Sequence, residues 1–285
     1  MSGEQEFLKW QVGDVTITRI VELTTTSLGP HLLPQATPEK LAQLPWLAPF
    51  VADGRIILSV HALVIESQGQ RLLVDPCIGN DKVRTYPRWN MMQTGFLEQF
   101  AAAGFATGSI DAVMCTHMHV DHVGWNTRLV EGRWLPTFAA ARYLFAESEW
   151  EHWRNEEQEY GPVIEDSVAP IFAAGLADLV ESSHQVTDEV ALEPTPGHTP
   201  GHVSVHITSR GEEAVITGDM IHHPCQIAHV DWSSSADWDQ QMAAGTRLGF
   251  LERYADRPVL IIGSHFATPS AGRLVRDGQT FRLDC

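Results

Sequence analysis

Short apolar runs alternate with polar segments along the whole chain and predict many short strands. Residues 15–23 alternate in the manner of a half-buried strand, and residues 56–67 and 70–75 predict two strands joined by a turn at Gln68-Gly69. Further short strands are expected at residues 112–116, 142–146, 179–182, 189–193, 203–208, 214–217 and 259–263.

Helical periodicity is found between these strands. Residues 95–104 place three apolar side chains on one face, and Ser148 is expected to cap a helix that begins at Glu149. Further helices are expected within residues 163–174 and 236–254. Because strands come early in each half and helices follow, the pattern favours an α/β fold of two packed sheets with helices outside, a four-layer αβ/βα sandwich.

One stretch near the N-terminus departs from this pattern. Residues 29–49 hold five prolines and few strand signals, which predicts an irregular arm at about residues 24–55 with one short helix after Thr37-Pro38, capped by Thr37. Residues 80–94 are polar and aromatic and predict a loop over a pocket. No linker rich in Gly, Ser or Pro divides the sequence, so residues 1–285 are expected to form a single domain.

The charge balance excludes several kinds of partner. The chain has 19 Lys and Arg against 36 Asp and Glu, a formal net charge of -17. Such a surface repels nucleic acid and anionic membrane surfaces, whose binding needs cationic side chains. The four cysteines show no metal or disulfide spacing, which is typical of a reducing cytoplasm. No secretory signal is recognisable, and no apolar run reaches the roughly 20 residues of a membrane span, so a cytoplasmic protein is expected.

Candidate metal ligands are concentrated in residues 117–122, His-Met-His-Val-Asp-His, directly after an apolar run of strand length. In an extended segment residues two apart face the same way, so His117 and His119 can bind one ion together. Asp121 and His122 are adjacent and can point to different ions if the chain then turns into a helix. Imidazole suits Zn, Fe, Ni or Co, and carboxylate adds Mn.

Other ligand-type residues follow later strands. His198 lies in Thr-Pro-Gly-His-Thr-Pro-Gly-His, where proline and glycine favour a rigid presenting loop. Asp219 follows the apolar run that ends at Thr217, and His265 follows the run 259–263. His202 is expected to face the core or solvent without a role in the site.

Together, the HxHxDH, PGHTPGH and TGD segments and the late strand-end histidine resemble the metallo-β-lactamase superfamily, over about residues 15–265. The resemblance implies two divalent ions with a hydroxide between them. Zinc is the expected metal, with Mn, Fe, Co or Ni as alternatives. The resemblance also implies that Asp75 orients a ligand imidazole, and that Asp121 both binds metal and accepts a proton. The implied ligands are His117, His119 and His198 for the first ion, Asp121, His122 and His265 for the second, and Asp219 as the bridge.

Within the superfamily, the chain most resembles N-acyl homoserine lactonases and methyl parathion hydrolase-like phosphotriesterases. This implies a small-molecule substrate, a homodimer, and hydroxide attack on a lactone or other ester carbonyl; the alternative is phosphotriester hydrolysis. Two residues depart from the lactonase pattern. Trp125 stands where many lactonases have the second glycine of DHxGG, and His222 stands where lactonases often have a tyrosine that assists the substrate carbonyl. His222 is therefore the candidate catalytic donor.

Three other classes share part of the ligand set. A glyoxalase II-like thioesterase usually adds basic glutathione-binding residues in a C-terminal helical region, and this sequence ends soon after His265, which makes that class less expected. A persulfide dioxygenase uses one iron and lacks a complete second site. A non-catalytic metal-bearing binding module would bind two metals without turnover, so metal analysis combined with hydrolysis assays separates these alternatives.

Overall fold

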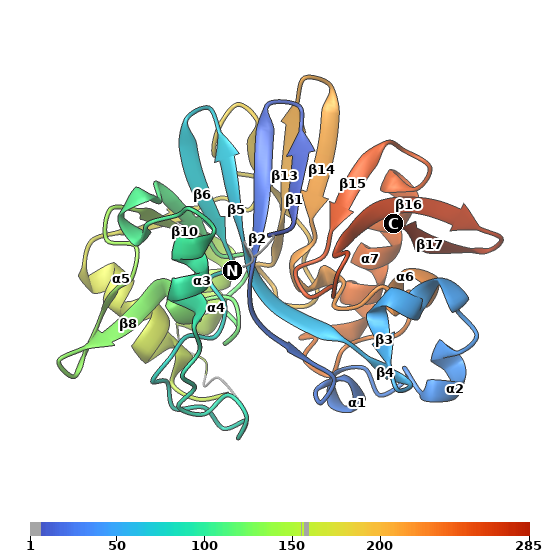
Figure 1. Ribbon diagram of the computed structural model, residues 1–285, viewed down its shortest axis with the longest axis horizontal. Helices are drawn as coiled ribbons and strands as arrows, with labels where there is room; N and C mark the ends of the chain where they lie inside the picture. Colours follow the sequence, from blue (N-terminus) through green and yellow to red (C-terminus); the bar gives the residue numbers. More distant parts are fainter. Residues whose placement is uncertain (1–6, 155, 157–159) are drawn as a thin grey trace, which may run out of the picture. The chain divides into compact units, whose positions relative to one another are not determined.

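The computed structural model describes residues 7–154, 156 and 160–285, and its internal contacts divide the chain into two compact units. Unit 1 comprises Met1–Glu22 and Val60–Glu181, and unit 2 comprises Leu23–Ser59 and Ser182–Cys285. Each unit has one large β-sheet with its own helices (Figure 1). Among the described residues, no helix combines the length and apolar character needed to cross a bilayer.

The sheet of unit 1 places the first ligand segment at the end of a parallel strand pair. Its order is β1-β2-β5-β6-β7-β10-β11, and β6, β7, β10 and β11 are parallel neighbours. Val74 of β6 pairs with Met114 of β7, so the residues after both strands emerge at one edge of the sheet. The bounds are β1 Lys9–Val12, β2 Val15–Thr25, β5 Leu58–Ser67, β6 Gln70–Val74, β7 Ala112–Met114, β10 Arg142–Ala146 and β11 Ala177–Val180.

The helices of unit 1 lie where the sequence pattern predicted them, but one predicted N-cap differs. The helix predicted from Glu149 begins at Glu147, and Ala146 precedes it without a side-chain cap, so the prediction of a Ser148 cap was wrong. The chain passes directly from β10 into this helix, which leaves Ser148 inside the first turn. The elements are α3 Phe96–Ala102, α4 Glu147–Trp153, a π-helix Ile164–Val168, α5 Ala169–Ala173, 3₁₀ turns Thr107–Ser109 and Gly124–Asn126, and the hairpin β8 Thr127–Val130 and β9 Arg133–Pro136.

Residues 80–94 form a loop, as predicted, and buried charges hold it in place. The carboxylate of Asp166 accepts two hydrogen bonds from the Arg84 guanidinium, at 2.6 and 2.9 Å. Lys82 is fully buried, and its ammonium lies 3.4 Å from Asp166 Oδ1 and over the ring of Trp134. Burial lowers the pKa of Lys82 to about 7, although the Asp166 charge acts in the opposite direction. Two cationic residues therefore tie this loop to the π-helix.

In unit 2 the sheet repeats the arrangement with a second parallel pair. The order is β12 to β17, and β14 and β15 are the parallel neighbours, with Ile216 opposite Ile262. The residues after these two strands, which include Asp219 and His265, therefore emerge at the same edge. The bounds are β12 Val190–Pro194, β13 Val203–Ser209, β14 Glu212–Ile216, β15 Val259–Ile262, β16 Ala271–Asp277 and β17 Thr280–Asp284.

The arm belongs to unit 2 and contributes to its core. The predicted helix begins at Pro38, but Thr37 makes no side-chain cap, and two further helical segments accompany it. Leu47 and Phe50 of the arm are buried, and Phe50 packs edge-on against Phe266. Burying such side chains stabilises the fold by about 1.5–3 kcal/mol each. The segments are α1 Gly29–Leu32, α2 Pro38–Leu41, 3₁₀ Pro45–Phe50, β3 Val51–Ala52 and β4 Arg55–Ile56.

Two further helices of unit 2 follow Asp219 in the sequence, α6 Cys225–Ala228 and α7 Gln240–Tyr254. The sequence pattern predicted α7 from residue 236. It begins at Gln240 because the Asp239 carboxylate accepts a hydrogen bond from Met242 N at 2.9 Å and caps the first turn. Residues 233–239 are thereby left as a loop, and this loop carries Asp237.

Candidate metal centre

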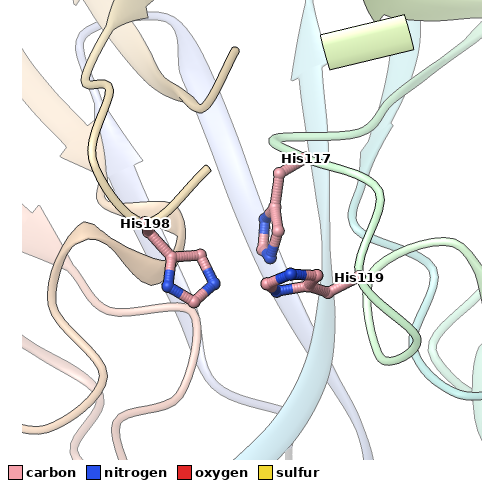
Figure 2. Close-up of side chains that lie close together, drawn as sticks. All are labelled: His117, His119 and His198. Carbon is pink, nitrogen blue, oxygen red and sulfur yellow. The ribbon is translucent and has the colours of Figure 1, made fainter. Parts of the chain in front are cut away.

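Unit 1 carries four of the seven predicted ligands on the segment that follows β7. His117 and His122 are buried, whereas His119 and Asp121 are partly exposed. The His117 ring centroid lies 4.6 Å from that of His119 and 4.1 Å from that of His122. His117 and His119 point to the same side, as their spacing predicted (Figure 2). The segment continues into a turn and a 3₁₀ helix rather than an α-helix.

Asp75, at the end of β6, fixes two of these imidazoles. Its Oδ2 lies 3.0 Å from His122 Nδ1, which is the contact that the resemblance implied. The Thr116 hydroxyl donates to Asp75 Oδ2 at 2.8 Å and lies 3.0 Å from His117 Nδ1. Because the hydroxyl proton is used toward Asp75, the hydroxyl oxygen accepts from His117 Nδ1–H. His117 therefore carries its proton on Nδ1 and leaves Nε2 for a metal, and the proximity of Asp75 to His122 Nδ1 favours the same arrangement in His122.

A second buried acid holds the backbone of the ligand segment, and the sequence pattern did not reveal it. Glu149 Oε1, on α4, accepts from Met118 N at 2.9 Å and from Trp153 Nε1 at 2.6 Å. The Trp153 ring lies 5.3 Å from that of His119. In the sequence, Glu149 is an acidic residue in the first turn of a predicted helix. Solvent-exposed helices commonly have the same pattern, so it did not indicate a buried role for Glu149.

The end of the segment packs very closely on the chain after β6. A Cβ at Gly124 would lie 1.8 Å from the Ile78 carbonyl oxygen, so only glycine fits there. Trp125 is buried; it donates to Glu22 Oε1 at 2.7 Å and stacks on Phe96. Burial raises the pKa of Glu22, although hydrogen bonds such as that from Trp125 act to lower it. Trp125 therefore belongs to the interior of unit 1.

Unit 2 presents His198 from the rigid loop that the sequence predicted. Gly197 has a φ of +133°, and a Cβ there would lie 2.4 Å from Ala243 N of α7. The loop thus rests directly on α7. His198 is buried, with Nδ1 at 2.9 Å from Asp237 Oδ1 and Nε2 at 3.5 Å from Asp219 Oδ2.

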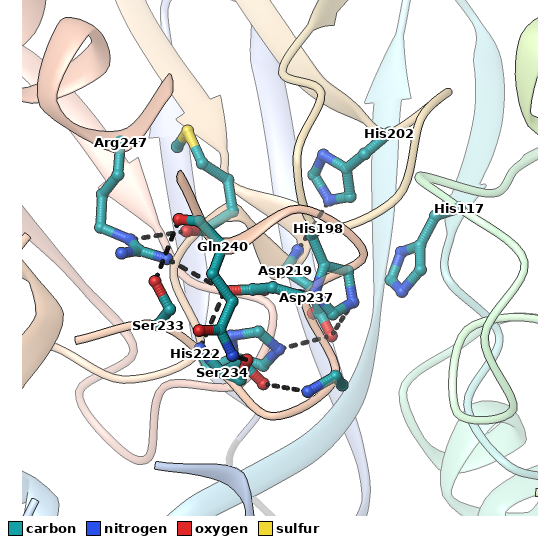
Figure 3. Close-up of polar contacts among 12 residues, drawn as sticks. His117, His198, His202, Asp219, His222, Ser233, Ser234, Asp237, Gln240 and Arg247 are labelled. Atoms are coloured by element: carbon teal, nitrogen blue, oxygen red, sulfur yellow. Dashed lines mark hydrogen bonds and ion pairs between the residues drawn. The ribbon is translucent and has the colours of Figure 1, made fainter. Parts of the chain in front are cut away.

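Asp219 lies among three imidazoles of unit 2, and its two oxygens face different ones. Figure 3 shows it beside two of them, His198 and His222. Oδ1 is 3.0 Å from His265 Nε2, whereas Oδ2 is 3.2 Å from His222 Nε2 and 3.5 Å from His198 Nε2. His198, Asp219 and His222 each offer a ligand atom within 4.8 Å of the others, so this group could hold a metal ion. His265 Nδ1 lies 3.0 Å from the Ser59 carbonyl oxygen and donates to it, which again leaves Nε2 for a metal.

His202 was expected to have no role in the site, and its contacts show a supporting one. It is buried, and its Nε2 accepts a hydrogen bond from Asp219 N at 2.9 Å. Its Nδ1–H then faces Thr195 O at 3.1 Å. His202 therefore holds the backbone of the central carboxylate, a contact that strand periodicity cannot reveal.

The side chains present fit divalent metal ions. Among the predicted ligands, His117, His122, His198 and His265 each engage Nδ1 with an oxygen, which is the arrangement that orients imidazoles for metal binding through Nε2. Imidazole and carboxylate together suit zinc and its neighbours in the first transition row.

Comparisons with known proteins find solved structures of the same fold. A dizinc quorum-quenching lactonase, AidC, in complex with a product superposes with a TM-score of 0.79 at 21% identity, covering 97% of this chain and 96% of that one. A hydrolase of the beta lactamase superfamily, AbOPH, gives 0.81 at 20% identity, covering 98% and 97%. A probable metal-dependent hydrolase from Staphylococcus aureus gives 0.72 at 19% identity, covering 96% and 98%.

These similarities establish the fold, and the predicted α/β fold class is confirmed. No curated protein sequence gave a significant match. The model of the metallo-beta-lactamase superfamily matches residues 55–273, well over half of the sequence. The chain therefore belongs to the metallo-β-lactamase superfamily.

Proposed function

We propose that the chain is a dinuclear metal-dependent hydrolase of lactones or other carboxylic esters. In this proposal the first ion is bound by His117, His119 and His198, and the second by Asp121, His122 and His265, with Asp219 as the bridge. The carrying observation is the orientation of Asp219. Its Oδ2 is directed to His198 and its Oδ1 to His265, two imidazoles assigned to different ions. A carboxylate whose oxygens face imidazoles of both proposed sets is suited to bridge the two ions.

Two bound divalent ions would supply a water of lowered pKa and polarise the oxygen of the bond under attack. The residues of the chain would set the geometry and move the protons. Asp121 has a side chain 13% exposed, more than that of Asp75 or Asp219, and is placed to accept a proton at its carboxylate. Asp75 and Glu149 hold the ligand segment in a fixed position, so that the imidazoles need no reorganisation when a metal ion binds.

His222 is proposed to assist the substrate as a hydrogen-bond donor. Its side chain is almost fully buried, and neither ring nitrogen makes a hydrogen bond to the described residues, although Nε2 lies 3.2 Å from Asp219 Oδ2. A buried imidazole without such a bond is costly unless a ligand completes it. A substrate carbonyl oxygen, or the oxygen of a phosphotriester, would accept from its N–H.

The lactone assignment is supported by the structural similarity to AidC, a dizinc quorum-quenching lactonase in complex with a product. Phosphotriester hydrolysis is the second candidate, because His222 replaces the tyrosine that lactonases often have there. Thioesterase activity and a binding module without turnover are the remaining alternatives.

The test is a substrate panel on protein of defined metal content. The chain, loaded with zinc and measured by elemental analysis, is assayed against N-acyl homoserine lactones, aryl esters, a thioester and a phosphotriester. Two metals per chain and turnover of lactone or ester support the proposal. Preferential turnover of the phosphotriester replaces the substrate class, and two metals with no turnover on any member of the panel refutes the hydrolase.

A homodimer and a cytoplasmic location also belong to this proposal. The homodimer is proposed from the family resemblance, and the location from the cysteine usage. Sedimentation equilibrium and cell fractionation would test them.

A further inference from the structure

The proposed ligand imidazoles differ in what supports them. His265 is backed by the Ser59 carbonyl, and His117 by the Thr116 hydroxyl, which are neutral groups. His122 is backed by the carboxylate of Asp75, and His198 by the carboxylate of Asp237. Carboxylate support is therefore given to one imidazole of each proposed ion.

Asp237 is held firmly in this position. Its side chain is fully buried, Oδ1 accepts from His198 Nδ1 at 2.9 Å, and Oδ2 accepts from Ser234 N at 2.8 Å (Figure 3). The guanidinium of Arg247, also fully buried, lies 3.9 Å from Asp237 Oδ2. A carboxylate in such surroundings is stable only when hydrogen bonds and a nearby cation offset its desolvation.

Arg247 connects this support to the backbone beside the bridging acid. From the interior of α7 its Nε donates to the Met220 carbonyl at 3.0 Å, and its Nη1 donates to the Val230 carbonyl at 2.6 Å. Met220 directly follows Asp219. One buried guanidinium thus fixes the chain after Asp219 and also faces the acid that orients His198.

We propose that Asp237 is a positioning residue for the first metal ion, the counterpart of Asp75 at the second, and that Arg247 holds it in place. The inference rests on the proposed function, because it assumes that His198 binds a metal. Asp237 keeps the His198 proton on Nδ1 and directs the Nε2 lone pair to the ion, and its charge makes the imidazole a stronger ligand. Loss of such an acid typically weakens metal affinity by about 10–100-fold.

The test compares Asp237→Asn and Asp237→Ala with the wild-type chain. The asparagine keeps a hydrogen-bond acceptor in the same shape and removes the charge, whereas the alanine removes both. The matched control is Asp239→Asn, which lies two residues away and retains a side chain that can cap α7. Zinc affinity is measured by competition with a chromogenic chelator, and circular dichroism verifies the fold.

The expected result is a loss of about 10–100-fold in the affinity for one of the two ions in Asp237→Asn, a larger loss in Asp237→Ala, and no change in the control. A second measurement does not need metal: nitrogen-15 NMR of the metal-free wild-type chain should show His198 protonated on Nδ1, and Asp237→Ala should shift that proton toward Nε2. Unchanged zinc affinity in folded Asp237→Asn, or a wild-type His198 protonated on Nε2, would overturn the proposal.

Failure of the inference is distinguishable from failure of the proposed function. If the wild-type chain binds two ions and hydrolyses an ester while both variants retain full affinity, only the role of Asp237 is wrong. If the wild-type chain binds no zinc, the hydrolase proposal fails and takes this inference with it.

Discussion

The protonation of His223 should make the stability of the fold depend on pH. His223 is fully buried in unit 2, where Nε2 donates to the Phe50 carbonyl at 2.9 Å and Nδ1 accepts from Cys225 N at 3.1 Å. Both nitrogens of the neutral ring are therefore used, and a second proton would displace the Cys225 hydrogen bond. Burial lowers the pKa of His223 to about 4, although its bond to Phe50 O acts to raise it.

Proton linkage gives the sign and the size of this effect on the free energy of unfolding. An unfolded histidine titrates near 6.5, so between pH 6.5 and about 4 the unfolded chain binds a proton that the folded chain excludes. The contribution of neutral His223 is thus fully present above about pH 6.5 and is lost as the pH falls toward 4. The whole gap corresponds to about 3 kcal/mol, and about 2 kcal/mol of it should be lost by pH 5.

Urea unfolding of the metal-free chain at pH 7.5 and pH 5 measures this loss. His223→Gln removes the titrating group, so the variant should lose about 2 kcal/mol less than the wild-type chain between the two pH values, whatever its absolute stability. His31→Gln, at an exposed position, should follow the wild-type pH dependence. Equal losses in wild type and His223→Gln would refute the assignment of this pH dependence to His223.

The other predictions concern the site. Gly124→Ala should lower the melting temperature and the zinc content together, because the new Cβ would meet a backbone carbonyl at 1.8 Å, whereas Gly249→Ala, in open space on α7, should be neutral or stabilising when measured by differential scanning fluorimetry. Asp219→Ala, and likewise Asp121→Ala, should reduce both hydrolysis and metal content sharply; wild-type turnover in either would exclude the proposed centre. His222→Phe should reduce kcat by about 10²-fold or more with little change in melting temperature, and unchanged kinetics would show that it is no substrate donor.

The sequence could predict those parts of the site that depend on residues close together in the chain. Four ligand-type side chains lie within the six residues 117–122, and Asp75, Asp219 and His265 each follow an apolar strand. Ligand type, spacing and strand end are all short-range properties. These properties marked the candidate residues, and the resemblance to the superfamily then implied which ion each would bind.

The supporting acids could not be predicted in the same way. Glu22, Glu149 and Asp237 belong to no ligand motif in the sequence, and each acquires its role from a partner brought near by folding: Trp125 for Glu22, Met118 N for Glu149 and His198 for Asp237. Their separations from these partners in the sequence are 103, 31 and 39 residues. A carboxylate is more often solvated than packed in the interior, so the residue type alone argued against all three.

Apart from His198, which a loop after β12 presents, each unit places its proposed ligands after a parallel strand pair: β6 and β7 in unit 1, and β14 and β15 in unit 2. Strand ends are rigid because their registers are fixed by backbone hydrogen bonds, and that rigidity suits a metal, which needs ligands held within a few tenths of an ångström. Substrate recognition has no such requirement and is carried by loops. We propose that the arm and residues 80–94 contribute to it, and neither contains a ligand motif. The metal chemistry should therefore be readable from sequence throughout this superfamily, whereas the substrate has to be measured.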